Sequence, residues 1–314
     1  MAEAKNAVSI DGQQILRDRE KAVEWYARLV PGQRLLDIGF YVTFFFEARH
    51  FPERRRAAYE ILKEYWFRVG EHLRWTTNLK THKWEPVTAK HSADAWFAAQ
   101  PKEPWVWAII LHAGATFNAV SPYRFEGVGT PNPHEASFIT AMFPVTWFVE
   151  HPEASAVDIV QRWATLLHPR HGTAGLSIVD SLDRISARPR QARALAERFP
   201  GLEVDDALSA SLYVQKGIRS VNWLTCIDDS LITCLGGIEA LRKRVTGDLH
   251  LYEYPGGAIV RAGDFPQAGD RNRQLLIEPY RRAAALLRPV QPRYTGIMLG
   301  FDAESTQDWV NRFN

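Results

Sequence analysis

Residues 35–46 read LLDIGFYVTFFF and contain the longest apolar stretch of the chain, which is interrupted by Thr43. Aromatic and β-branched side chains favour strands, and an apolar run of this length fits a strand that is covered on both faces. Pro31-Gly32 precedes the segment and Pro52 follows it, so it is bounded by residues that commonly separate elements. We therefore predict a buried strand over 35–46, with the other elements packed around it.

Amphipathic helices are predicted on both sides of this strand. Over 13–30 apolar residues recur at helical spacing, and over 52–69 they line one face while charged residues occupy the other. Further helices are predicted from Ser155 to Pro169 and over 188–199, 236–245, 279–288 and 302–312. Further strands are predicted over 105–112, 138–150, 173–179, 208–214, 221–226 and 294–300, with a hairpin of 249–254 and 258–262 around Pro255-Gly256-Gly257. Residues 76–104 and 114–134 are predicted to be loop-rich and irregular.

These elements define the expected fold class. Strands and helices alternate without a clean series of β-α-β units, so we expect mixed or antiparallel sheets flanked by helices, an α+β (mixed α/β) fold. Residues 1–314 are expected to form one compact unit, with a possible subdivision into 1–134 and 135–314. A weak repeat relates Val42–Glu47 to Val145–Glu150. It indicates either two pseudo-related halves or two ordinary strand–helix units.

The composition excludes several classes of protein. The 314 residues include 38 basic and 36 acidic side chains, and the net charge of +2 argues against both a dedicated nucleic-acid binder and an acidic DNA mimic. The first 14 residues lack the apolar core of a signal peptide, and no apolar run approaches the ~18 residues of a membrane span. Two cysteines, Cys226 and Cys234, suggest reduced thiols rather than a disulfide framework. We expect a soluble protein of the bacterial cytoplasm.

No motif in the sequence marks a catalytic, cofactor or metal site. The P-loop, the dinucleotide-binding fingerprint and G-x-S-x-G are all absent. His168 and His171 flank Arg170 at a predicted helix end, where a cation complements the helix dipole. The same two histidines leave open an uncharacterised enzyme with a histidine-containing cleft. We favour a binding protein without catalytic residues, cofactor or metal.

Segments in the last half of the chain resemble the motifs of a known family. They are His171–Gly175 (H-G-x-A-G), Arg198–Leu202 (R-[FY]-P-G-[LM]), Asn222–Thr225 with Leu235–Ile238 and Leu241-Arg242 (W-L-[TN]…L-G-G…L-R), Gly263–Asp270 (G-x-x-P-x-x-G-D) and Trp309–Phe313 (W-x-x-R-F). Over about residues 15–313 the chain is similar to the immunity proteins of type VI secretion that are paired with nuclease effectors, the TsiV and TsiT immunity proteins.

This resemblance implies a cytoplasmic antitoxin that protects the producing cell and its kin by binding a cognate nuclease effector. Inhibition would act by occluding the active site of the toxin, by distorting the toxin or by blocking its oligomerisation. A homodimer is also compatible with the resemblance, whereas direct binding to nucleic acid or to a membrane is not expected. The glycines and aromatic residues of the motifs are expected to serve turns and packing.

Candidate contact residues follow from residue chemistry alone. They are Trp84, Asp205, Asp206, Asp228 and Asp229. Tryptophan is enriched in interface hot spots, and carboxylates suit the basic substrate groove of a nuclease and raise the association rate. Adjacent carboxylates in an extended segment point in alternate directions, so each Asp pair fits a recognition patch better than a metal site.

Overall fold

The structure, a computed structural model, describes residues 12–29, 36–47, 51–78, 81, 83–99, 106–180, 188–204, 206–298 and 300–314. The strands are β1 (Leu36–Phe46), β2 (Trp75–Thr77), β3 (Trp84–Pro86), β4 (Trp107–His112), β5 (Arg124–Gly129), β6 (Ser137–Pro144), β7 (His171–Asp180), β8 (Glu203–Val204), β9 (Leu224–Asp228), β10 (Leu249–Tyr254) and β11 (Gly257–Ala262). The α-helices are α1 (Gly12–Leu29), α2 (Phe51–Val69), α3 (Ala93–Ala99), α4 (Val145–Glu150), α5 (Ala156–Leu167), α6 (Arg188–Arg198), α7 (Ala207–Ala210), α8 (Asp229–Cys234), α9 (Ile238–Arg244), α10 (Glu278–Leu287) and α11 (Ala303–Val310).

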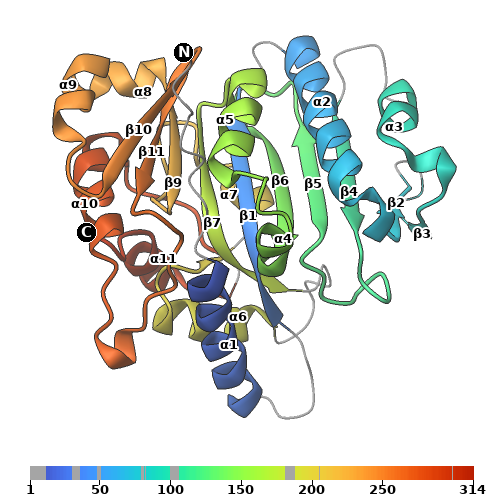
Figure 1. Cartoon of the computed structure of the whole chain (residues 1–314). Helices are drawn as coiled ribbons and strands as arrows, with labels where there is room; N and C mark the ends of the chain where they lie inside the picture. The colour runs from blue at the N-terminus through green and yellow to red at the C-terminus, as the bar shows by residue number, and fades with distance from the viewer. Residues whose placement is uncertain are drawn as a thin grey trace.

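One large sheet organises these residues (Figure 1). The strand order is β10-β11-β9-β7-β1-β6-β5-β4-β2-β3, and β8 pairs with β7 beside this path. The pairings are antiparallel except for β7 with β8, which is parallel. The sheet contains strands from both sides of residue 134. The mixed α+β class with an antiparallel sheet flanked by helices is therefore confirmed.

The predicted strand over 35–46 is the central strand β1, and all 11 of its residues are buried. It pairs with β6 and β7, so that Phe40 lies opposite Phe143 and Phe45 lies opposite His171. Helices α2 and α5 lie in front of the sheet and α7 lies behind it (Figure 1). Because both faces are covered, β1 accommodates a nearly continuous apolar sequence.

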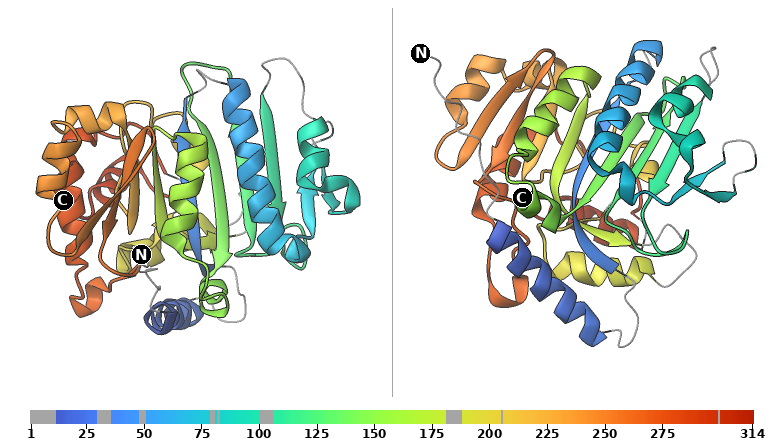
Figure 2. Two further views of the ribbon diagram at one scale, coloured as in Figure 1. Left: turned by 45° about the horizontal axis from the view of Figure 1, so that its top comes forward. Right: turned by 45° about the vertical axis from the view of Figure 1, so that its right-hand side comes forward.

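Smaller units close the sheet at its two edges. The hairpin of β10 and β11 lies beside α8, α9 and α10, and the hairpin of β2 and β3 lies beside α3 at the other edge (Figures 1 and 2). Helix α1 packs where β1 begins, through Ala22 and Val23 against Leu36 and Ile38. The opposite, C-terminal end of β1 is therefore remote from α1.

Most predicted helices and the predicted hairpin are confirmed. Helix α5 begins as expected at Ser155, whose hydroxyl accepts a hydrogen bond from the backbone N–H of Asp158 at 3.2 Å. The predicted buried stripe of this helix is Val157, Val160, Trp163, Ala164 and Leu167, and all five are buried. The hairpin turns at Pro255-Gly256, where Gly256 has φ 93°. A positive φ of this kind favours glycine.

The predicted strand over 138–150 is wrong in its second half. Strand β6 ends at Pro144, and Val145–Glu150 forms α4. Proline cannot donate to a sheet ladder but suits the residue before a helix, so the chain turns at Pro144. The repeat segments therefore differ in structure, since Val42–Phe46 lies in β1 while Val145–Glu150 is helical. The similarity does not mark a duplicated strand.

Two other predicted strands are also wrong. Residues 208–214 fall in α7 and the turn after it, because the buried residues Ala207, Ala210, Ser211 and Val214 recur at helical spacing. Residues 294–298 alternate between buried and exposed, but they pair with none of the strands that the structure describes. The backbone N–H of Met298 instead donates to Thr306 Oγ1 at 3.1 Å. An alternating pattern of burial is therefore insufficient by itself to identify a strand.

The segments predicted to be loop-rich contain strands. Residues 76–104 include β3, α3 and most of β2, and residues 114–134 include β5. The glycines of β5 indicated an irregular segment, yet they make room for a ring. A Cβ at Gly129 would lie 2.0 Å from Nε1 of Trp107, so the indole of the neighbouring strand β4 covers this position. The strand predicted over 221–226 is shifted to Leu224–Asp228.

Candidate partner-binding surface

The predicted acidic pair Asp228 and Asp229 lies at the junction of β9 and α8. The Asp228 carboxylate accepts hydrogen bonds from the backbone N–H of Leu231 at 2.9 Å and from the hydroxyl of Ser230 at 2.7 Å. It therefore caps α8, whose first N–H groups have no partner within the helix. Asp229 is exposed beside it. Both residues remain predicted contacts for a partner protein, and Asp228 also stabilises the start of α8.

The other predicted contact residues do not join this pair. Asp206 is 4% exposed and therefore offers little surface to a partner. The pKa of the buried Arg219 is raised although burial opposes the shift, and the charge of Glu203 contributes more to this rise than that of Asp206. Asp205 lies outside the described residues. Trp84 is in β3, and six strands separate β3 from β9 in the sheet. Its ring lies edge-on to His112 with 5.1 Å between ring centroids, and Trp84 stays a separate prediction.

His168 and His171 have different structural roles. His168 ends α5 in the left-handed conformation, with φ 45°, and its backbone N–H donates to the carbonyl of Ala164 at 2.8 Å. This is a helix-terminating role. His171 is buried in β7, where its ring stacks on Phe45 at 4.9 Å. Among the described residues, no group of three or more His, Cys, Asp or Glu side chains is arranged to hold a metal ion.

The burial of His171 makes folding sensitive to acid. The pKa of His171 is lowered to about 3, chiefly by burial and also by the positive charges of Arg219 and Arg170, while a hydrogen bond with the backbone of Val214 opposes the shift. The unfolded chain binds a proton near pH 6.5, whereas the folded chain does not, so stability falls as the pH drops below 6.5. We expect His171 to remove about 2 kcal/mol of unfolding free energy between pH 6.5 and pH 5.

Urea unfolding at several pH values tests this expectation. The variant His171→Phe keeps a ring against Phe45 but cannot titrate, so its stability is expected to depend less steeply on pH between 6.5 and 5 than that of the wild type. Parallel pH profiles for the two proteins would show that His171 is protonated in the folded state.

A buried charge network lies beside His171. Glu203 is 1% exposed and lies between two buried arginines. Its Oε1 accepts from Arg219 Nη2 at 2.7 Å, and its Oε2 lies 3.5 Å from Arg312 Nη2 and 3.3 Å from the Tyr41 hydroxyl. Burial lowers the pKa of Arg312 to about 10, and the charge of Glu203 opposes this shift. Arg312 also stacks 3.5 Å over the ring of Trp309, so the W-x-x-R-F segment is a packing device.

Two other motif segments bind one another. Arg198 donates to both carboxylate oxygens of Asp270, at 3.2 and 3.1 Å. The backbone N–H of Gly201 donates to the carbonyl of Ala268 at 2.8 Å. The R-[FY]-P-G-[LM] and G-x-x-P-x-x-G-D segments therefore form one joint in the fold, as the structural reading of these motifs predicts.

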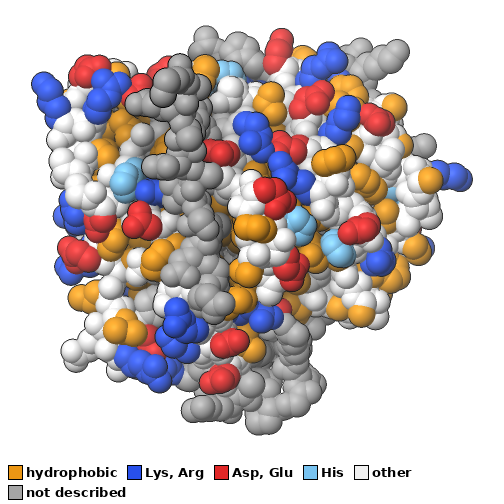
Figure 3. Space-filling model, in the orientation of Figure 1, with side chains coloured by type: hydrophobic (Ala, Val, Ile, Leu, Met, Phe, Trp, Pro, Cys, Tyr) orange, Lys and Arg blue, Asp and Glu red, His pale blue; other side chains and the backbone are white. Residues whose placement is uncertain are grey.

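The described surface in front of the sheet shows no concentration of one residue type. The face covered by α2 and α5 shows acidic, basic and apolar side chains interspersed in the part of Figure 3 that is coloured by residue type. Such a mixture is ordinary for a solvent-exposed face. A pocket of about 460 Å³ instead opens at the C-terminal end of β1.

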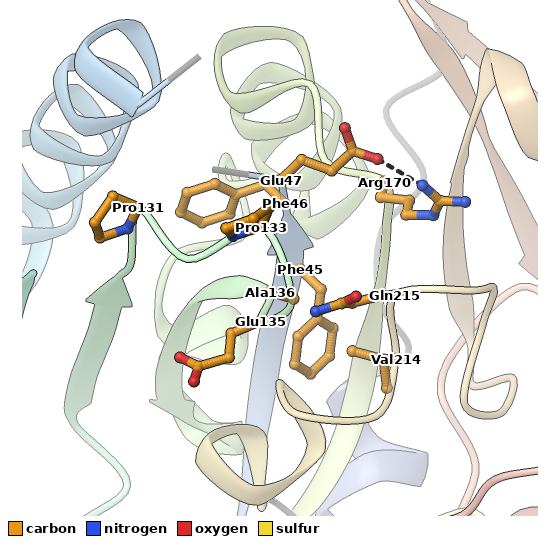
Figure 4. A pocket seen from close by; sticks show the side chains of 10 residues that line it. All are labelled: Phe45, Phe46, Glu47, Pro131, Pro133, Glu135, Ala136, Arg170, Val214 and Gln215. Atoms are coloured by element: carbon orange, nitrogen blue, oxygen red, sulfur yellow. Dashed lines mark hydrogen bonds and ion pairs between the residues drawn. The ribbon is translucent and has the colours of Figure 1, made fainter. Parts of the chain in front are cut away.

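We call this cavity the β1-end pocket (Figure 4). Six lining residues are apolar and four are polar. They are Phe45, Phe46, Pro131, Pro133, Ala136 and Val214, and Glu47, Glu135, Arg170 and Gln215. Arg170 Nη1 donates to Glu47 Oε1 at 2.5 Å across one side of the pocket. The backbone N–H of Asp228 donates to the carbonyl of Arg170 at 3.0 Å, so the predicted acidic pair borders this pocket.

Sequence reasoning did not find the β1-end pocket. Its walls come from the end of β1, the segment between β5 and β6, the residue before β7 and the turn after α7. Each segment alone reads as strand end or loop, and only the fold brings them together.

Comparison with known proteins gives the family context. A scan of family models matches residues 57–313 to TsiV, described as type VI immunity for VRR-NUC. Among solved structures, the chain is similar to the Pseudomonas aeruginosa T6SS protein PA0821, with 19% sequence identity, a TM-score of 0.79, and coverage of 89% of this chain and 82% of that chain. This likeness shows a shared fold. A search of curated proteins finds no match.

Proposed function

The chain belongs to the TsiV family of type VI immunity proteins for VRR-NUC, and from this premise we propose that it binds a nuclease effector of that kind and neutralises it. The observation that carries the proposal is the family match, which runs from α2 to Phe313. The protein acts by protein–protein contact rather than by catalysis, and it protects the producing cell and its kin. The fold shared with a T6SS protein supports this assignment.

We place this activity in the cytoplasm. Cys226 and Cys234 are both free thiols, as expected in a reducing compartment. None of the helices that the structure describes has the length and hydrophobicity needed to cross a membrane. A nuclease toxin that reaches the cytoplasm of a sister cell would meet its inhibitor there.

The direct test is to purify this protein with the VRR-NUC effector encoded beside its gene. We expect a one-to-one or two-to-two complex with a dissociation constant of about 1 nM or lower, as in other tight inhibitor complexes with interfaces of ~1,600 Å². The complex should lose DNA cleavage, and co-expression should restore growth of cells that produce the effector.

An unrelated nuclease serves as the control, and its activity should be unaffected. Absence of binding, or binding that leaves cleavage and toxicity intact, would refute the immunity function.

A further inference from the structure

The β1-end pocket contains an unused hydrogen-bond donor. Nε2 of Gln215 is buried and has no hydrogen-bond partner among the described residues. Figure 4 shows its amide group pointing into the pocket beside Phe45. An unpaired buried amide costs about 1–3 kcal/mol, and a carbonyl oxygen from a bound chain would remove this cost. A mostly apolar pocket with one polar anchor is typical of a binding site.

Apolar side chains continue from the pocket onto the surface of α7 and the turn after it. Leu208, Leu212 and Tyr213 are 43%, 50% and 43% exposed. They adjoin the pocket because the backbone N–H of Ala136, in the pocket wall, donates to the carbonyl of Ser211 at 2.9 Å. Clustered exposed apolar side chains mark contact sites for other proteins, whereas single ones are ordinary.

Buried contacts hold the pocket wall formed by Phe45 and Val214. His171 stacks on Phe45 and shares a hydrogen bond with the backbone of Val214, and both of these partners line the pocket. The buried network of Glu203 and Arg219 lies behind it. A preformed surface of this kind loses little conformational entropy on binding, which favours high affinity.

Carboxylates border the pocket and indicate the charge of its occupant. Glu135 lies in the wall of the pocket, and Glu47 lies at its rim in an ion pair with Arg170. Asp229 follows Asp228, whose backbone N–H donates to the carbonyl of Arg170. Lys216, the residue after Gln215, adds one opposing charge. Proteins that act on DNA contact its phosphates with lysine and arginine, so a nuclease offers basic side chains to such a border.

We propose that the β1-end pocket, together with Leu208, Leu212 and Tyr213, is the docking site for an apolar segment of the nuclease effector that is flanked by basic side chains. This inference rests on the proposed function. The apolar segment fills the pocket, one of its carbonyl groups accepts from Gln215, and its basic neighbours face Glu135 and Asp229.

The test compares two double variants against a catalytically inactive form of the VRR-NUC effector encoded beside the gene. The pocket variant is Leu212→Asp with Gln215→Ala. The control variant is Leu275→Asp with Leu276→Asp, at residues that are 51% and 63% exposed beside a different cavity. Calorimetry should show a dissociation constant at least ~30-fold higher for the pocket variant, as for loss of one hot spot, and a change below ~3-fold for the control.

Hydrogen exchange gives a second readout on the wild-type complex. Amides of residues 132, 134–136 and 208–215 should become protected on binding, whereas those of 272–276 should not. Wild-type affinity in the pocket variant, an equal loss in the control variant, or protection confined to other segments would overturn the docking site. Failure of the wild-type protein to bind the effector would instead overturn the proposed function.

Discussion

Replacing Glu203 with glutamine is expected to lower the unfolding free energy by about 3–5 kcal/mol, because it leaves buried positive charges without their counter-charge. Glu203 is the carboxylate between Arg219 and Arg312, and all three side chains are buried. The substituted amide would keep the size of the side chain but not its charge. Urea unfolding followed by circular dichroism measures the difference.

The matched control is Glu239→Gln on α9. Glu239 also pairs with an arginine, Arg242, at 2.6 Å, but this ion pair is exposed to solvent. An exposed pair contributes about 0–1 kcal/mol, so the control should be nearly as stable as the wild type. In addition, Arg219→Met should recover part of the stability lost in Glu203→Gln, because it removes one of the uncompensated charges. Equal losses in the Glu203 and Glu239 variants would contradict the role of the buried network.

This network gives the C-terminal W-x-x-R-F segment a structural role. Arg312 crosses from the end of the chain to Glu203, and its Nε also donates to the carbonyl of Pro200 at 2.7 Å. Arg312 thus holds in place the segment from Pro200 to Glu203, which leads into β8 and α7. Because α7 and its turn form one wall of the β1-end pocket, the motif supports the proposed docking site from within the core.

Local sequence is sufficient to predict an element when its pattern of apolar residues fits only one type of secondary structure. The strand over 35–46 is predictable because so long a run of apolar side chains is not stable when exposed to solvent. Helix α5 is predictable from its N-cap at Ser155 and its apolar stripe. Segments 145–150 and 208–214 were mispredicted because a short apolar run fits either a helix or a strand. What decides between them is the neighbour in space, which the sequence does not contain.

The same limit applies more strongly to the site. Charge alone predicts Asp228 and Asp229 as contacts, and the structure places them beside a pocket whose walls come from distant segments. The enrichment of tryptophan in interface hot spots predicts Trp84 as a contact as well, yet this residue lies in β3 at the far edge of the sheet. Asp206 has the same charge but is buried, where it acts electrostatically on Arg219. Residue type therefore predicts the chemistry of a contact, whereas only the fold predicts which residues act together.

Replacing Gly201 with alanine is expected to lower the unfolding free energy by about 4 kcal/mol, the sum of an overpacked core position and a lost hydrogen bond. A Cβ at this position would lie 1.9 Å from the carbonyl oxygen of Gln267. The obstacle is backbone, so no side-chain rotation relieves it. Separating the two segments would break the hydrogen bond from Gly201 to Ala268 and strain the ion pair of Arg198 with Asp270.

The variant Gly237→Ala distinguishes this clash from a conformational effect. Gly237 has φ 90° and ψ 169°, a region used almost only by glycine, but a Cβ there would meet nothing within 4 Å, so only backbone strain of about 1–3 kcal/mol is expected. Urea unfolding of both variants measures the difference. If Gly201→Ala were no less stable than Gly237→Ala, the two motif segments would not be held in the close contact that the structure shows. A larger loss of unfolding free energy for Gly201→Ala would show why the R-[FY]-P-G-[LM] motif contains this glycine. The glycine would be required because a second motif approaches it closely at Gln267, 66 residues later in the chain, and not because of the local turn.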